Sequence, residues 1–89
     1  MIEEVRQHLL SKGFIAIDDN TFELVQLQTQ QMIINGQVMN QDIKSVLKFV
    51  YIGEGSIDDD TIWGFSIYRD ENHIVDEWFG DIEQFKKVF

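Results

Sequence analysis

The chain contains no cysteine and no proline among its 89 residues. Without thiols it can form no disulfide and no cysteine-based zinc site, so its stability has to come from packing. No apolar run approaches the roughly 20 residues that span a bilayer, and the first residues lack the basic start and apolar segment of a signal peptide. We therefore expect a cytoplasmic protein that does not enter membranes.

Basic residues are also scarce. Lysine and arginine together number seven against sixteen acidic residues, which gives a formal net charge of −9. The imbalance lies between Glu54 and Glu83, where ten carboxylates accompany a single cation, Arg69. Such a surface repels the phosphates of nucleic acids and attracts basic proteins or cations. Direct nucleic-acid binding is therefore not expected.

The apolar content, 44% with 12% aromatic residues, is enough for one hydrophobic core. We predict a single domain over residues 1–89. Ile2, Val5 and Leu9 recur at helical spacing, which predicts an N-terminal helix. Near the other end, Asp81 occupies the position of an N-cap. The apolar residues that follow it share one face of a predicted C-terminal helix: Ile82, Phe85, Val88 and Phe89.

Between the two helices the sequence predicts strands. Residues 14–17 form a short apolar segment, and a polar turn and a second strand follow it. The dipeptide Asn35-Gly36 accepts the positive φ values of a type I′ turn. It predicts a hairpin in which residues 32–34 pair with residues 37–39.

The middle of the chain is more ambiguous. Residues 42–52 fit either a helix that begins after Asp42 or a strand rich in β-branched and aromatic residues, and the strand is favoured. Residues 53–60, which are rich in glycine and aspartate, are predicted to form a loop.

Residues 61–79 predict a second hairpin with two possible registers. A loop of two or four residues sets Trp63 opposite Trp78, which brings a carboxylate onto the apolar face. A three-residue loop, with Asn72 in the left-handed region, sets Gly64 opposite Trp78 and is favoured. The whole pattern predicts an α+β fold, with an N-terminal helix, about five mostly antiparallel strands in a meander, a C-terminal helix, and both helices on one face of the sheet.

Catalytic and metal-binding patterns are weak. Within a regular strand His73 and Glu77 share a face but lie roughly 13 Å apart at about 3.3 Å per residue, while Asp76 points to the opposite face. The acidic segments 18–20 and 58–60 do not continue into a calcium-loop pattern. We predict no catalytic residue, no metal site and no cofactor, and therefore a protein that is not an enzyme.

The acidic tract is the predicted partner-binding site, because aromatic anchors within a polar rim are typical of protein interfaces. The residues assigned to it are Glu54, Asp58, Asp59, Asp60, Asp70, Glu71, Asp76, Glu77 and Trp78. The leading hypothesis is a protein that inhibits or regulates a basic partner, such as a nucleic-acid enzyme or a toxin, by covering its cationic site. Nucleic-acid mimicry is one form of this, and phage-encoded inhibitors and immunity proteins offer an analogy of size and charge.

The alternative hypothesis rests on a second absence. Residues 24–41 carry six glutamines and no charged residue. The lysines and prolines that usually protect an exposed strand edge are missing there. The segment therefore indicates either an interior strand pair or a small structural protein that forms homodimers through this hairpin.

Overall fold

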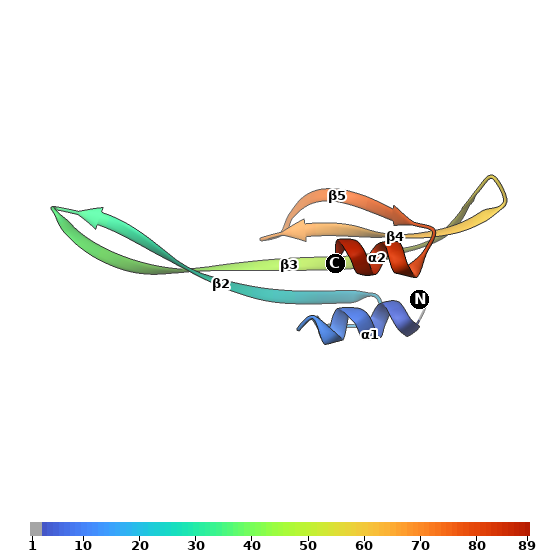
Figure 1. Ribbon diagram of the computed structural model, residues 1–89, viewed down its shortest axis with the longest axis horizontal. Coiled ribbons are helices and arrows are strands. Elements are labelled where there is room, and N and C mark those ends of the chain that lie inside the picture. The colour runs from blue at the N-terminus through green and yellow to red at the C-terminus, as the bar shows by residue number, and fades with distance from the viewer. Residues whose placement is uncertain (1–2) are drawn as a thin grey trace.

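The computed structural model describes residues 3–89. Along the chain, one helix precedes five strands and a second helix follows them (Figure 1). Their bounds are α1 Glu3–Ser11, β1 Ile15–Ala16, β2 Thr21–Ile34, β3 Gln37–Ile57, β4 Asp60–Arg69, β5 Asn72–Phe79 and α2 Ile82–Val88. Within the described residues no helix is long and apolar enough to cross a membrane.

The strands form one antiparallel sheet in the order β1-β2-β3-β4-β5, so each strand pairs with its neighbour in sequence. The predicted meander and the α+β fold are confirmed. Residues 42–52 are part of β3, which confirms the strand interpretation of that segment. The Asn35-Gly36 hairpin is also confirmed, because Asn35 and Gly36 have φ values of 53° and 76° and residues 32–34 pair with residues 37–39.

The hydrophobic core lies between the two helices and one face of the sheet. Val5 and Leu9 of α1 and Phe85 of α2 are fully buried against sheet residues that include Phe22 and Phe49. These residues recur at helical spacing in the helices and alternate in the strands, as burial of one face requires. We call the opposite side of the sheet the uncovered face.

The ends of the helices match their sequence signals in part. Asp81 has an extended backbone and its carboxylate accepts a hydrogen bond of 3.0 Å from the amide of Glu83, so it is the N-cap of α2. The prediction for Val88 is wrong, because its side chain is 58% exposed at the last turn. Ile2 lies outside the described residues.

The molecule is elongated, with extents of 62 × 22 × 22 Å. Residues 25–34 of β2 and 37–46 of β3 pair with each other beyond the part of the sheet that the helices cover (Figure 1). We call this two-stranded segment the ribbon. At the other end of the molecule the β3–β4 hairpin also extends past the helices.

The predicted loop at residues 53–60 is wrong, because β3 and β4 continue through it and leave only a two-residue turn. Asp58 and Asp59 have φ values of 50° and 66°, which are those of a type I′ turn. The glycines do not end the strand. Gly53, with a φ of 131°, follows a bulge, and Gly55 takes its place in the ladder.

The β4–β5 hairpin has the favoured register, with Gly64 opposite Trp78, but it does not reach it by a three-residue loop. Asp70 and Glu71 form a two-residue turn with φ values of 49° and 71°. A bulge restores the offset, because Ile74 has no partner on β4. A bulge adds one residue to one strand, so it has the same effect on register as one extra loop residue.

Candidate interaction surfaces

The predicted acidic site is divided among three places in the fold. Glu54 and residues 58–60 belong to the β3–β4 hairpin, Asp70 and Glu71 form the β4–β5 turn, and Asp76 to Trp78 lie along β5. The hairpin tip and the β4–β5 turn are at opposite ends of β4, whose ten residues span about 30 Å at 3.3 Å per residue. The structure therefore brings together the four acids of the hairpin, but not all ten acids of the tract.

One of the two acids of the β4–β5 turn, Asp70, already has hydrogen-bond partners. One carboxylate oxygen of Asp70 accepts a 2.9 Å hydrogen bond from the amide of Val46, and the other faces the hydroxyl of Ser45 at 3.4 Å. Asp70 and Glu71 also border a shallow hollow shared with Lys48. This turn is held against β3 and is less available as an anionic patch than its sequence suggests.

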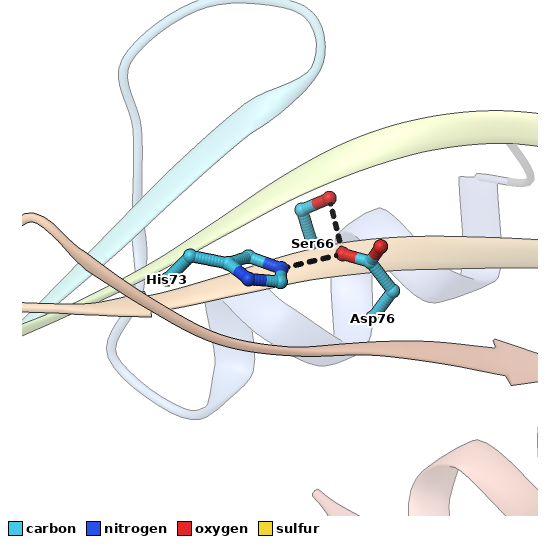
Figure 2. Close-up of polar contacts among 3 residues, drawn as sticks. All are labelled: Ser66, His73 and Asp76. Carbon is cyan, nitrogen blue, oxygen red and sulfur yellow. Dashed lines mark hydrogen bonds and ion pairs between the residues drawn. The ribbon is translucent and has the colours of Figure 1, made fainter.

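Asp76 is the centre of a polar cluster on the uncovered face (Figure 2). One oxygen of its carboxylate accepts a hydrogen bond of 2.7 Å from the hydroxyl of Ser66 and lies 2.8 Å from Nε2 of His73. The Ser66 hydrogen bond, followed by that of His73, lowers the pKa of Asp76 below its ordinary value. The prediction that His73 and Asp76 face opposite ways is wrong, because the bulge at Ile74 reverses the alternation of the strand.

The same three residue types occur in serine hydrolases, but the order of contacts differs. In the Ser-His-Asp triad a histidine lies next to the serine hydroxyl, and the carboxylate lies behind that histidine. Here the carboxylate lies between Ser66 and His73, and its lowered pKa makes it a weak base. The cluster links β4 to β5 and does not have the arrangement that activates a nucleophile.

Aromatic and basic side chains extend this face. The Tyr68 ring lies 5.3 Å from that of His73, and the ammonium of Lys48 is 5.0 Å from the centre of the Tyr68 ring. Trp78 is 44% exposed. Its ring lies over Gly64, where an added Cβ would be 2.8 Å from the indole. A side chain at position 64 would displace the indole, so this glycine sets the position of Trp78.

Acidic side chains at the tip of the β3–β4 hairpin differ from those elsewhere in the tract. Within residues 3–89 the ion pairs are His73 with Asp76 and Lys86 with Glu83, and neither involves the hairpin. At its base, Tyr51 is partly buried, and burial followed by the charge of Glu54 raises the pKa of its hydroxyl. No group of three histidine, cysteine or acidic side chains in the described residues is placed to hold a metal ion.

The ribbon has the largest apolar exposure. Ile33 and Val38, which pair across the two strands, are 78% and 65% exposed. Six further large apolar side chains of the ribbon are exposed: Val25, Leu27, Met32, Ile34, Met39 and Ile43. A polar contact holds its middle, where the Thr29 hydroxyl donates to Asp42 at 3.0 Å. The sequence indicated this segment through its lack of charge, but not its length or its distance from the core.

Comparison of the chain with models of protein families, with curated protein sequences and with solved structures gives no match in any of the three. The functional argument therefore depends on the physical properties of these surfaces.

Proposed function

We propose that this chain is a non-enzymatic assembly protein that forms homo-oligomers through the ribbon. The observation that carries the proposal is the exposure of eight large apolar side chains on two paired strands. Four of them lie on each face of the ribbon, as the alternation of side chains along paired strands requires. Exposed apolar side chains concentrated in one segment are typical of an interaction site. A hairpin without further strands or a helix against it is also only marginally stable in water, so a partner would stabilise it.

Charge favours a second copy of the same chain at this place. Two molecules with a net charge of −9 repel each other over most of their surfaces. Residues 24–41 carry no charge, and the only charges of the ribbon, Asp42 and Lys44, cancel. The ribbon is therefore where two copies can approach with the least repulsion, and the other end, with its acids, stays in solvent.

The test is the oligomeric state, measured by light scattering and analytical ultracentrifugation over a range of protein concentrations. Ile33→Lys places a charge on the ribbon, and Ile57→Lys makes the same change at an exposed isoleucine outside it. We expect the wild type and Ile57→Lys to associate, and Ile33→Lys to remain a folded monomer. A wild-type protein that stays monomeric at millimolar concentration would remove the proposal.

A second candidate function is regulation of a basic protein by the β3–β4 hairpin. The observation that favours it is the group of carboxylates at the tip of this hairpin, residues 58–60, with Glu54 nearer its base; the hairpin extends beyond the helices (Figure 1). Replacing Asp58, Asp59 and Asp60 by asparagine keeps the turn and removes the charge. If the tip covers a cationic site, proteins captured from a lysate should be lost in this variant and released by about 0.5 M salt. Capture that is insensitive to both changes would contradict this function.

A further inference from the structure

The outer edge of β2 has regularly spaced backbone groups without partners. Within residues 3–89, β1 pairs with Phe22 and Glu23 only, so beyond them β2 has a described neighbour on one side, β3. The carbonyl of Thr21 accepts a hydrogen bond of 2.8 Å from Ile17 on the outer side, whereas that of Asn20 accepts one of 2.8 Å from Tyr51 of β3. Along an antiparallel strand, successive residues point their amide and carbonyl groups to opposite sides of the strand. The residues whose amide and carbonyl point outward are therefore Val25, Leu27, Thr29, Gln31 and Ile33.

The outer edge of β3 is better protected. There the amides and carbonyls of the even-numbered residues point outward. Those of Val46 already have partners: its carbonyl accepts a hydrogen bond of 2.9 Å from the Asp70 amide, and its amide donates one of 2.9 Å to the Asp70 carboxylate. The rest of that edge includes Asp42 and Lys44. Charged side chains discourage the addition of a strand. The β2 edge has none between Leu24 and Ile34, so it is the edge that can accept another strand.

The sequence of β2 is nearly symmetric about Thr29. Residues 24–34 read LVQLQTQQMII, with apolar pairs at both ends and polar residues around the centre. If a second copy pairs with β2 in antiparallel orientation about a two-fold axis at Thr29, Val25 lies opposite the second copy's Ile33, and Gln28 lies opposite its Gln30. All five outward-pointing residues then face one another, as the hydrogen-bonded positions of an antiparallel ladder must. The apolar pairs at the two ends and the polar pairs at the centre match and stabilise such a ladder, whereas Leu27 lies opposite Gln31 and Gln26 opposite Met32.

We propose that two copies of this chain join through residues 25–33 of β2, paired about a two-fold axis at Thr29, to form a continuous sheet across the dimer. This proposal rests on the proposed function and specifies its geometry. Nine residues at about 3.4 Å cover roughly 30 Å of edge and bury on the order of 500–600 Å² per copy, near the lower limit of specific interfaces at about 1,200 Å² in total. The dimer should therefore dissociate on dilution.

The lack of native cysteine permits a direct test by single-cysteine crosslinking. In a hydrogen-bonded antiparallel pair the two Cα atoms are about 5.5 Å apart, which is within the range of a disulfide. In a glutathione buffer, full-length Thr29→Cys should become a disulfide-linked dimer, at least tenfold more than the matched variant Asn40→Cys, which places an exposed cysteine on β3. A second pair of variants tests the non-covalent dimer. Thr29→Glu should weaken association at least tenfold, because two carboxylates meet at the axis and each lies beside an Asp42 that cannot neutralise it, and Asn40→Glu should change it less than threefold.

The outcomes separate this geometry from the function on which it rests. Association of the wild type without crosslinking of Thr29→Cys, or with faster crosslinking of Asn40→Cys, would overturn the β2 pairing and leave assembly through the ribbon intact. A wild type that never associates would remove both. Amide hydrogen exchange gives a readout that needs no variant. Protection should increase with protein concentration at Val25, Leu27, Thr29, Gln31 and Ile33, and an increase at Val38 and Asn40 in their place would also overturn the proposal.

Discussion

The same two strands belong to two very different environments. Where β2 pairs with β3 beneath the helices, Phe22 lies opposite Phe49 and neither side chain is exposed. Further along the same ladder Ile33 lies opposite Val38, and both are mostly exposed. The backbone pairing is continuous between the two places. Burial, and not hydrogen bonding, therefore distinguishes the folded body of the protein from its ribbon.

The difference also separates what stabilises the fold from what is available for binding. In the part of the chain that the structure describes, the core cluster has ten buried residues, and none of them is in the ribbon. Net hydrogen-bond energies are small, since folding exchanges bonds to water for bonds within the protein. The ribbon should therefore contribute little to the free energy of unfolding of a monomer, and changes in the two regions should have separate effects.

The largest expected effect is that of truncating a core aromatic side chain. The Phe49 ring lies 5.0 Å from that of Phe14 and 4.8 Å from that of Phe89, so Phe49→Ala leaves a cavity between the sheet and both ends of the chain. We expect a loss of about 3–5 kcal/mol in the free energy of unfolding, measured by urea denaturation. The control is Ile33→Ala at a dilution where the protein is monomeric, with a change within about 0.5 kcal/mol. Similar losses in the two variants would contradict the separation.

A smaller loss is expected where β4 and β5 approach each other closely. A Cβ on Gly64 would lie 2.8 Å from the Glu77 carbonyl oxygen and from the Trp78 ring. Gly64→Ala should therefore cost about 1–3 kcal/mol, the usual range for overpacking. At Gly55 the nearest atom, on Ile62, is 3.8 Å away. Gly55→Ala should be neutral within about 0.5 kcal/mol. Tryptophan fluorescence would show whether the indole moves, and an unchanged stability of Gly64→Ala would mean that the strands can separate at no cost.

Shortening the ribbon tests the comparison directly. Deleting residues 27–32 and 39–44 removes six cross-strand pairs and preserves both the Asn35-Gly36 turn and the alternation of faces. We expect the shortened monomer to unfold with a free energy within about 1 kcal/mol of the full chain, because a lone hairpin is marginal. Its melting temperature should no longer rise with protein concentration. Failure of this variant to fold would show that the ribbon is part of the stable body.

The smallest effect concerns the Asp76 cluster, which lies outside both the core and the ribbon. Since the pKa of Asp76 is lowered in the folded protein, its contribution to stability is present above the pKa of the unfolded chain. That contribution is lost as the pH falls through the lower, folded pKa. Ser66→Ala removes the largest cause, so the pKa of Asp76 should move back toward its ordinary value in a carboxyl-resolved NMR titration. An unchanged pKa would contradict the hydrogen bond that Figure 2 shows.

The parts of the fold that depend on local chemistry could be predicted from the sequence. Asn35-Gly36 specified a turn and with it a register, and the apolar spacing around Val5 and Phe85 specified the helices. Gly53 and Gly55 were misleading, because glycine lowers strand propensity while a paired neighbour can still hold it in a ladder. The loop predicted there is a hairpin for this reason.

The surfaces were harder to predict. The acids between Glu54 and Glu83 are close in sequence, but because the sheet is a meander some of them lie at one end of β4 and some at the other. The contact between His73 and Asp76 depends on the bulge at Ile74, and no residue type in this segment predicts a bulge. Asn35-Gly36 indicated the turn of the ribbon and the lack of charge in residues 24–41 indicated its surface, but distance from the core is a tertiary property that no local pattern encodes.

The position of α2 has a consequence for the order in which the protein folds. Three of the four strand connections are two-residue turns, so the meander can form from contacts between chain neighbours, which are quick to find. Phe85 of α2, by contrast, packs near α1 and 5.3 Å from the Trp63 ring. During synthesis α1 can cover its part of the aromatic face early, but the part beneath Phe85 stays exposed to water until residues 82–88 leave the ribosome. We therefore expect the docking of α2 to be the last step of folding.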